Sequence, residues 1–404
     1  ENGSGKTTIL ETLSTFLNLG SIEAFEYINY MANGMSYTIT QEPDGNPELG
    51  FHSRKNETDG TTKVIKSSRN YNRRSIDSDP ADLRHYGFAY STIQQLDSEK
   101  YENDSTDDFT PIKQLIVDID AQDNSEWMRI TESGAGTPFT AFKQMSKKYR
   151  FEKAFNEFFG TVTFRGVDNT NPDEIKIIFE KHGKEISVDN LSTGEKQIVF
   201  RGAHLLKNIN SMSGGIVLVD EPELSMHPKW QQKVLQYYRN LFNKNGSQDV
   251  QMIIATHSEY VLRSALEDRD NVLIVVLSDD NGTIHSKNIT APTILPTITS
   301  AETNYLAFGI LSADYHIELY GYLQNKTGNF TVKSCDDYII AQTGLLNPAL
   351  HTKTSSFTNQ RGQTTNYQTL PTYIRNLIDH PDPTQSYTQE ELKCSIELLI
   401  KLCR

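Results

Sequence analysis

The chain opens with Glu1-Asn2-Gly3-Ser4-Gly5-Lys6-Thr7-Thr8, and this stretch decides the fold. Residues 1–7 match the end of the pattern G-x-x-x-x-G-K-[ST], in which a glycine-rich loop leads from a strand into a helix. The first glycine of the pattern would fall one position before Glu1. We therefore expect the natural chain to continue upstream into the strand that precedes such a loop. Residues 8–13 carry apolar side chains at helical spacing, which predicts an amphipathic helix.

The composition of this loop suits a phosphate chain. Gly3 and Gly5 let the backbone curl, so that successive N–H groups face the phosphates at the positive end of the helix. Lys6 can reach the β- and γ-phosphates, and the Thr7 hydroxyl can hold Mg²⁺. An ordinary Gly-Ser turn is the alternative, but it does not account for Gly-Lys-Thr in register. We therefore expect a nucleotide to bind on Asn2, Gly3, Ser4, Gly5, Lys6, Thr7 and Thr8.

Two later segments supply other groups that phosphoryl transfer needs. Residues 216–219 are four consecutive aliphatics, which predicts a strand buried on both faces of a parallel sheet. Asp220 at its end is expected to meet Mg²⁺ through water, and Glu221 is placed to polarise an attacking water molecule. A second buried strand is predicted at 252–255 and leads to His257, which can donate a hydrogen bond to the γ-phosphate. A histidine after a strand is more often an ordinary surface residue, so His257 is weak evidence by itself.

A third segment, Leu191-Ser192-Thr193-Gly194-Glu195-Lys196-Gln197, lies between the loop and these strands. Alone it could be a helix N-cap with Glu195 in the first turn. The order of loop, LSTGE, Asp-Glu and His on successive strand–helix junctions is hard to obtain by accident. It resembles the ATP-binding-cassette (ABC) ATPases, in the soluble branch that holds the SMC-, RecF-, OLD- and AAA_21-like proteins. The matching motifs are the signature at 191–197, with Thr193 where the family usually has Gly, the Walker B pair Asp220-Glu221, the switch histidine His257, and the acidic segment 223–228 that ends in His-Pro.

This resemblance implies an α/β fold, a P-loop ABC-type ATPase domain with a mixed or parallel sheet and a helical lobe. In this family two units face head to tail, and each ATP is held between the phosphate loop of one unit and the signature of the other. ATP, Mg²⁺ and a homodimer are therefore implied. Ser192 and the Gly194 backbone N–H would act on the partner's γ-phosphate, and Glu195 of the same motif is also expected to be a nucleotide-binding residue. The family also has a Mg²⁺-sensing glutamine, for which Gln94, with Gln95 beside it, is the candidate.

Residues 20–185 form a long insertion between the phosphate loop and the signature. Alternating residues at 27–30 and 37–40 predict antiparallel strands around an Asn33-Gly34 turn, and the acidic stretch 97–108 predicts a solvated loop. Residues 142–159 predict a helix that either contacts nucleic acid or a partner, or simply exposes a basic face. Its basic residues are Lys143, Lys147, Lys148 and Arg150. Sustained heptads are absent, which argues against a DNA-tethering coiled coil.

Residues 300–404 are predicted to form a separate all-α domain, with helices over 302–322 and from residue 388 onwards. In it, Arg375-Asn376-x-x-x-His380 stands on a predicted helix that Pro381 ends. An arginine that stabilises phosphate charge and a histidine that moves protons could cleave RNA without a metal, using the 2′-OH as nucleophile.

The pattern resembles the R-x4-6-H motif of the HEPN ribonucleases, small helical domains whose active site forms across a dimer. The domain order is similar to that of bacterial anticodon nucleases and abortive-infection ATPases. The alternative interpretation is a surface helix end capped by His380, with Arg375 in an ordinary ion pair.

Composition limits the setting of the protein. The 404 residues carry a net charge of -13, which argues against indiscriminate nucleic-acid binding. Residues 300–404 hold 8 basic and 10 acidic side chains, so this part is close to neutral. Cys335, Cys394 and Cys403 fit neither a disulfide framework nor a zinc site. No apolar stretch approaches the roughly 18 residues of a membrane span. We therefore expect a cytoplasmic protein without membrane association.

Together these features predict an ABC-type ATPase domain at residues 1–295 and a HEPN-like ribonuclease domain at residues 300–404. The predicted function is an ATP-driven homodimer that controls cleavage of tRNA or another RNA in anti-phage defence. The predicted catalytic residues are Glu221, His257, Arg375, Asn376 and His380. Two alternatives stay open. One is an ATPase sensor whose helical tail binds a separate effector or inhibitor protein. The other is a DNA-repair ATPase, which the acidic charge and the missing coiled coil disfavour.

Overall fold

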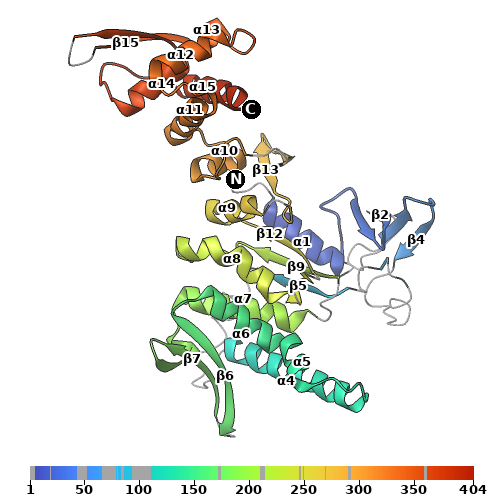
Figure 1. Ribbon diagram of the computed structural model, residues 1–404. Coiled ribbons are helices and arrows are strands. Elements are labelled where there is room, and N and C mark those ends of the chain that lie inside the picture. Colours follow the sequence, from blue (N-terminus) through green and yellow to red (C-terminus); the bar gives the residue numbers. More distant parts are fainter. Residues whose placement is uncertain are drawn as a thin grey trace. The chain divides into compact units, whose positions relative to one another are not determined.

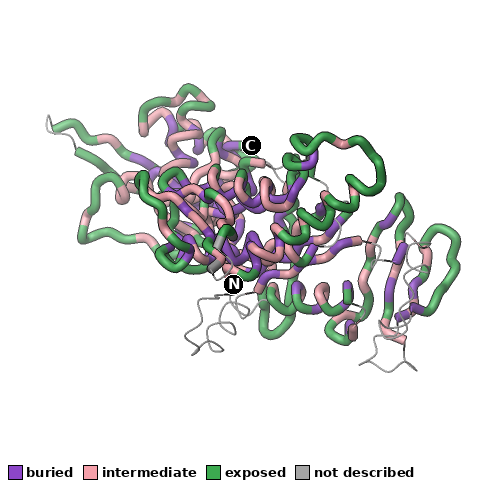
Figure 2. Tube along the Cα trace, turned by 90° about the horizontal axis from the view of Figure 1, so that it is seen from below, coloured by how far each residue is buried: buried purple, intermediate pink, exposed green. Residues whose placement is uncertain are grey.

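The computed structural model describes residues 5–18, 20–42, 52–65, 79, 81–82, 86–92, 111–171, 174–209, 214–244, 247–248, 250–268, 270–289, 293–358 and 362–404. The chain forms two compact units, Gly3–Val261 and a second that holds Leu262–Arg404. Figure 1 shows the helices and strands of both units, and Figure 2 shows buried residues gathered inside the layers with exposed residues at the outer turns. The predicted domain boundary near residues 295–300 stays a prediction.

A three-stranded parallel sheet forms the middle layer of the first unit. Its strands are β5 (Phe88–Ser91), β9 (Gly215–Asp220) and β12 (Val250–Ala255), in the order β12-β9-β5. Val217 and Val219 belong to the largest hydrophobic cluster, whereas Ile216 and Leu218 belong to a second cluster on the opposite face. The strand predicted at 216–219 is confirmed, and it is buried on both faces as its aliphatic run indicated.

Helix α1 (Lys6–Leu17) covers one face of this sheet. Its residues Leu10 and Phe16 are buried in a cluster with Leu218 and Ala255. The helix begins at Lys6, directly after Gly5, whose φ of 82° lies in the left-handed region that favours glycine. The helix predicted after the glycine-rich loop is therefore confirmed.

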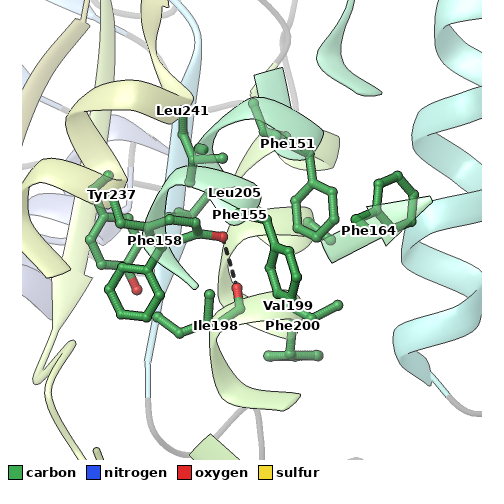
Figure 3. Packing of buried hydrophobic residues seen from close by; sticks show 14 of the residues in the cluster. Phe151, Phe155, Phe158, Phe164, Ile198, Val199, Phe200, Leu205, Tyr237 and Leu241 are labelled. Carbon is green, nitrogen blue, oxygen red and sulfur yellow. Dashed lines mark hydrogen bonds between the residues drawn. The ribbon is translucent and has the colours of Figure 1, made fainter. Parts of the chain in front are cut away.

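Helix α7 (Thr193–Asn208) packs against β5 on the other face, and α4 (Pro111–Glu132), α6 (Lys147–Phe158) and α8 (Pro228–Leu241) pack around α7. They share a core with an antiparallel sheet of three strands, β6 (Val162–Asn171), β7 (Glu174–Lys181) and β8 (Lys184–Ser187). Figure 3 shows the centre of this core, where Phe155 and Phe158 pack beside Tyr237. The Tyr237 hydroxyl donates a hydrogen bond to the Ile198 carbonyl oxygen at 2.9 Å, so the buried phenol is satisfied.

The single helix predicted over 142–159 is wrong in its continuity. The structure has two helices, α5 (Phe139–Met145) and α6, on either side of Ser146. Ser146 has an extended backbone, and its hydroxyl accepts a hydrogen bond from the Tyr149 N–H. A serine that caps the second helix in this way also ends the first, because an N-cap residue is not helical itself.

An antiparallel sheet in the insertion has the order β1-β2-β3-β4. Its strands are β1 (Ile28–Ala32), β2 (Met35–Gln41), β3 (His52–Asn56) and β4 (Thr62–Ile65). Asn33 and Gly34, with φ of 49° and 73°, join β1 to β2, and Ala32 pairs with Met35. Positive φ at both central residues is the geometry that Asn-Gly turns adopt in two-residue hairpins. The predicted hairpin is confirmed.

Five helices of the second unit contribute described residues to one hydrophobic core: α10 (Ser300–Phe308), α11 (Ala313–Thr327), α12 (Val332–Ala341), α14 (Leu370–Asp379) and α15 (Gln389–Cys403). Strands β15 (Thr352–Thr358) and β16 (Thr364–Thr369) pack against α14. The prediction of an all-α domain over 300–404 is therefore wrong, because β15 and β16 form an antiparallel hairpin. Both strands are rich in threonine, whose branched Cβ suits a pleated strand better than a helix. The helix predicted over 302–322 is divided into α10 and α11, because Gly309 adopts φ 67° and caps the first.

The described chain also contains several shorter helices and strands: η4 (Val188–Asn190), β10 (Asn243–Lys244), β11 (Ser247–Gln248), α9 (Glu259–Glu267), β13 (Val275–Asp280), β14 (Thr283–Asn288) and α13 (Pro348–His351). Among the helices that the structure describes, none combines the length and the apolar character that crossing a bilayer requires.

Candidate functional site

Three chain segments that are far apart in sequence meet at one edge of the parallel sheet. Strands β9 and β12 run parallel with Ala255 opposite Asp220, so both end at the same level. The first turn of α1 reaches this edge, because the Thr7 hydroxyl donates a hydrogen bond to Asp220 Oδ2 at 3.0 Å. Figure 1 shows α1, β9 and β12 next to one another. Ligands of open α/β sheets bind at such carboxyl edges.

The described part of the glycine-rich loop has the conformation of a helix start. Gly5 is the N-cap of α1, and Lys6, Thr7 and Thr8 form its first turn. The first N–H groups of a helix have no partner within the helix, and they point where an anion can bind. The predicted residues Asn2, Gly3 and Ser4 lie outside the described residues, as do Gln94 and Gln95.

Asp220 is a buried carboxylate with one oxygen available to bind a cation. The residue is 4% exposed, and its Oδ1 has no hydrogen-bond partner among the described residues, while Oδ2 accepts from Thr7. The pair therefore presents a hydroxyl and a carboxylate oxygen together. Mg²⁺ is typically bound by one or two such oxygens plus phosphate oxygens and water, so the donor set fits this ion. Groups of three or more His, Cys, Asp or Glu that could hold a metal are absent from the described residues.

Glu221 follows Asp220 with an unusual backbone conformation. Its φ of 43° lies in the left-handed region, which residues other than glycine rarely adopt. Its N–H donates to the Ala255 carbonyl oxygen at 2.9 Å and so continues the pairing between the two strands. The side chain is 27% exposed, with Oε1 3.5 Å from His257 Nε2. Backbone strain of this kind occurs often at functional sites, and here it turns the carboxylate towards the histidine.

His257 is held mostly as neutral imidazole. Burial lowers its pKa below the usual value, and the positive charge of Lys6 lowers it further, while Glu221 opposes this shift. A neutral imidazole carries one N–H donor and one acceptor nitrogen, so it can donate a hydrogen bond to a phosphate oxygen. The structure thus brings together Lys6, Thr7, Asp220, Glu221 and His257, as the sequence predicted.

The segment predicted as the signature forms a capping box at the start of α7. Ser192 Oγ accepts from the Glu195 N–H, and Glu195 Oε2 accepts from the Ser192 N–H at 2.7 Å. Glu195 also pairs with Lys181 Nζ at 2.9 Å, and together these contacts lower the pKa of the carboxyl group although burial opposes them. The Glu195 carboxylate is therefore committed to the helix start. This is the geometry that the helix-cap interpretation expected. Ser192 and Thr193 are exposed, whereas Gly194 and Glu195 are buried.

Gly194 has no room for a side chain. A Cβ at this position would lie 2.9 Å from Trp230 Cζ3 and 3.4 Å from the Ser225 carbonyl oxygen. The turn at the start of α7 is therefore packed against the loop that follows β9 and against the first turn of α8. Two parts of the predicted site, the strand edge and the signature, are connected through this loop.

Two residues at the strand edge were missed by reasoning from sequence. Arg201 is fully buried, and its Nη1 donates to the Asp220 carbonyl oxygen at 2.7 Å. Glu223 is 8% exposed, and its Oε1 accepts from the Thr256 hydroxyl at 2.7 Å and from the His257 N–H at 2.8 Å. The acidic segment after Asp220-Glu221 pointed to Glu223, although not to a role. Nothing in the sequence marks Arg201, because α7 offers several polar residues and only the fold shows which one is buried.

Of the basic residues in the predicted helix 142–159, Lys147 and Lys148 bind other groups of the protein and Arg150 is buried. Lys147 Nζ donates to Gln122 and to the Ile209 carbonyl oxygen, and Lys148 Nζ pairs with Asp120 at 2.6 Å. Arg150 is 5% exposed. These contacts favour a structural role for this region over a basic surface for nucleic acid.

In the second unit, the three predicted catalytic residues lie together at the end of α14. Arg375 Nη1 donates to Asn376 Oδ1 at 3.0 Å, and the His380 N–H donates to the Asn376 carbonyl oxygen at 2.8 Å. Arg375 Nη2 also pairs with Asp379 at 2.5 Å, and the exposed His380 ring stacks on Phe357 with centroids 5.8 Å apart. His380 is the C-cap of the helix. The ion pair and the cap are the features that the alternative interpretation expected.

Residues 1–263 match the AAA_21 family, described as an AAA domain, putative AbiEii toxin, Type IV TA system. The Retron Vc95 probable ATPase of Vibrio cholerae serotype O1 biovar El Tor is 35% identical over 102 residues, 23% of this chain and 19% of that protein. The Retron Ec83 probable ATPase of Escherichia coli is 31% identical over 110 residues, 25% of this chain and 19% of that protein. The chain thus aligns with about a fifth of the length of these two relatives. Septu protein PtuA of Bacillus thuringiensis is 23% identical over 71% of each chain.

Among solved structures, two SMC head domains are similar to this chain at low TM-scores. The SMC head bound to the C-winged helix domain of ScpA has 17% identity and a TM-score of 0.38, and it covers 72% of this chain and 88% of that chain. The SMC head domain from Thermotoga maritima has 16% identity and a TM-score of 0.34, with the same coverage.

Proposed function

The chain belongs to the AAA_21 family of ATPases, and on this basis we propose that it binds ATP with Mg²⁺ and hydrolyses it at the edge of the β12-β9-β5 sheet. The observation that carries the proposal is the convergence of Thr7, Asp220, Glu221 and His257 from three separate segments. Phosphoryl transfer to water needs a cation site, a positioned base and donors for the transferred phosphate, and residues of suitable chemistry for each lie at this edge.

Each residue has a defined part in this proposal. The N–H groups at the start of α1 and the Lys6 ammonium bind the phosphates, while Thr7 and Asp220 hold Mg²⁺, which when bound neutralises charge on the phosphate oxygens. Glu221 accepts a proton from the attacking water, and His257, kept neutral by burial, donates a hydrogen bond to the γ-phosphate. The contact between Glu221 and His257 keeps the base beside that donor.

We further propose that ATP joins two chains, with Ser192 and the Gly194 N–H of each chain acting on the γ-phosphate bound by the other. The exposure of Ser192 and Thr193 supports this proposal, because it leaves the start of α7 open to a second chain, while the buried Gly194 fixes the turn against Trp230. A partner or inhibitor protein and a role in anti-phage defence in the cytoplasm belong to the same proposal, and they rest on the family resemblance of the motifs.

Two substitutions in the full-length protein test the ATPase. We expect Lys6→Ala to abolish ATP binding in a nucleotide titration, since it removes the cation that contacts the phosphates. We expect Glu221→Gln to bind ATP normally but to lower kcat by roughly 100- to 10,000-fold, the usual contribution of a general base. Glu221→Gln with ATP and Mg²⁺ should also accumulate as a dimer in size-exclusion chromatography.

Lys143→Ala, which removes an exposed cation of α5, is the control and should behave as wild type. ATP binding by Lys6→Ala with wild-type affinity contradicts the proposed site.

We propose as a second activity metal-independent RNA cleavage at Arg375, Asn376 and His380, which rests on the resemblance of this pattern to the HEPN motif and on the side-chain hydrogen bond from Arg375 to Asn376. In this proposal the paired Arg375 is released from Asp379 when RNA phosphate binds. Asp379→Asn should therefore retain or raise cleavage of total tRNA, whereas His380→Ala should abolish it. Cleavage undiminished by His380→Ala excludes the ribonuclease assignment and leaves the second unit as a domain for binding an effector.

A further inference from the structure

Glu223 is a buried carboxylate that contacts the segment carrying His257. It lies on the loop after β9, two residues beyond Glu221, and only 8% of it is exposed. Its Oε1 accepts two hydrogen bonds, from the Thr256 hydroxyl at 2.7 Å and from the His257 N–H at 2.8 Å. Both donors belong to the three residues that separate β12 from α9. Hydrogen bonds to an ionised carboxylate are about twice as strong as those between neutral groups.

The second oxygen of Glu223 lies in a buried polar group of side chains. Oε2 is buried without a hydrogen-bond partner among the described residues, and so is the Tyr238 hydroxyl. Burial raises the pKa of Tyr238 to about 12, with the Arg201 charge lowering it and the Glu223 charge raising it, so this hydroxyl lies near both charges. Arg201 in turn binds the Asp220 carbonyl oxygen. Glu223 and the buried Arg201 thus both contact the segments that end at the edge of the sheet, Glu223 through Thr256 and His257 and Arg201 through the end of β9.

The segment with His257 has a second attachment, to helix α8. Ser258 Oγ donates to Gln231 Oε1 at 2.6 Å, and Gln231 Nε2 donates to the Met226 carbonyl oxygen at 3.0 Å. Thr256 Oγ1 accepts from the Ser258 N–H at 3.0 Å, so it links the two attachments. The Thr256 hydroxyl thus donates to Glu223 and accepts from Ser258, which fixes its orientation.

We propose that Glu223 is a positioning residue for ATP hydrolysis, which holds Thr256 and the backbone of His257 so that the imidazole stays opposite Glu221. The inference rests on the proposed ATPase function and adds to it a residue that touches neither nucleotide nor water. Its effect passes through His257. A displacement of a reacting group by about 1 Å can lower a rate by about 100-fold. Loss of the two hydrogen bonds that Glu223 accepts would let the His257 segment move, and kcat would fall for this reason.

A purely structural role for Glu223 predicts a different pattern, and a double-mutant cycle separates the two. Glu223→Ala is expected to lower kcat by roughly 10- to 100-fold with ATP affinity unchanged, because Lys6 and the start of α1 are intact. In a His257→Ala background the same substitution should have no further effect on kcat, since the residue it positions is already absent. An equal loss in both backgrounds overturns the inference.

Thr256 offers a matched pair of variants that spare the carboxylate. Thr256→Ser keeps the hydroxyl that donates to Glu223 and should retain most of kcat. Thr256→Val keeps the branched shape, loses the donor, and should lower kcat in the same direction as Glu223→Ala. Glu223→Gln, which keeps an acceptor oxygen but not the charge, should fall between wild type and Glu223→Ala. Equal kcat for the serine and valine variants contradicts the proposed contact.

Amide hydrogen exchange without nucleotide tests the contact independently of catalysis. Glu223→Ala should speed exchange of the His257 amide at least tenfold, because its acceptor is gone, while amides in the middle of α8 keep their protection. Unchanged exchange at residues 256–258 overturns the inference. If the wild-type protein hydrolyses no ATP but its exchange still differs from that of Glu223→Ala, the proposed function is overturned. The hydrogen bonds that Glu223 accepts from this segment would then still be supported.

Discussion

Two glycines of α7 lack space for a side chain, but for different reasons. At Gly202 a Cβ would lie 2.0 Å from the Tyr237 hydroxyl oxygen, which is buried and bonded to the Ile198 carbonyl oxygen. At Gly194 the nearest atom belongs to the edge of the Trp230 ring, which is partly exposed and can move. Gly202 therefore packs in the core, and Gly194 packs the turn of the proposed signature against Trp230.

Alanine at these two positions should separate stability from activity. Gly202→Ala forces the tyrosine out of place and should lower the free energy of unfolding by about 3 kcal/mol, the upper range for overpacked cores. Gly194→Ala needs only a shift of Trp230, so we expect a loss of about 1 kcal/mol, together with loss of ATP hydrolysis. Denaturant unfolding and steady-state ATPase measurements check both. Normal hydrolysis by Gly194→Ala contradicts the role of the turn.

At the residue scale, the sequence was sufficient to predict residues at positions where the chemistry of the site allows only one or two residue types. Lys6, Thr7, Asp220 and Glu221 stand in short patterns that phosphate and magnesium binding require, so they could be predicted without a fold. Glu223 could not, because its importance depends on burial and on two donors from the segment after β12, more than thirty positions away in sequence.

At the element scale, α7 and α15 begin with the same device. Ser192 with Glu195 and Thr388 with Glu391 both form complete capping boxes, in which each side chain binds the other residue's N–H group. Only the first box lies at the proposed nucleotide site. The second belongs to the helix that closes the core of the other unit. The two boxes are therefore a natural control for each other.

Removing either N-cap should lower the free energy of unfolding by a similar amount, but only one of the two substitutions should lower the ATPase rate. Ser192→Ala and Thr388→Ala should each lower the free energy of unfolding of their unit by about 1 kcal/mol, the typical loss for an N-cap. Only Ser192→Ala should also reduce ATP hydrolysis, because its hydroxyl is proposed to reach the partner's γ-phosphate. Melting curves and ATPase rates of the two variants check this. An equal ATPase loss in both means that the effect comes from destabilisation alone.

Elements were predictable where one local signal dominates, as in the Asn33-Gly34 hairpin and the aliphatic strand β9. They were not predictable where a single residue interrupts a continuous pattern. Ser146 divides α5 from α6, and Gly309 divides α10 from α11, although apolar periodicity continues past both. The β15–β16 hairpin was not predicted because the threonine and serine residues of β15 are also common in turns.

At the scale of the whole molecule, the second unit contains a buried histidine and two buried thiols. His316 is fully buried, and its Nε2 lies 2.8 Å from Ser395 Oγ. Burial lowers the pKa of His316 to about 3, and it raises the pKa of Cys335 to about 11 and of Cys403 to about 12. The folded unit therefore keeps the imidazole neutral and the two thiols protonated and inaccessible to reagents in solution.

This histidine should make the second unit sensitive to acid. The unfolded chain binds a proton at His316 near pH 6.5 and the folded chain only near pH 3, so stability is lost as pH falls between these values. The slope contributed is at most about 1.4 kcal/mol per pH unit. Labelling of the buried cysteines with a pyridyl disulfide, over a urea series at pH 7 and pH 5, reports opening of this unit. His316→Gln should show a smaller loss between the two pH values, and an equal loss in both proteins contradicts the assignment.

The register of β9 and β12 also determines where the chain can change in length. Ala255 lies opposite Asp220, and His257 follows only two residues later. An inserted residue between Ala255 and His257 moves the imidazole by about 3.3 Å and reverses the side on which it projects. The exposed turn at Asn281 and Gly282, between β13 and β14, carries no such requirement. Natural insertions and deletions should therefore collect in loops such as that one, and the spacing from β12 to His257 should stay constant among relatives that hydrolyse ATP.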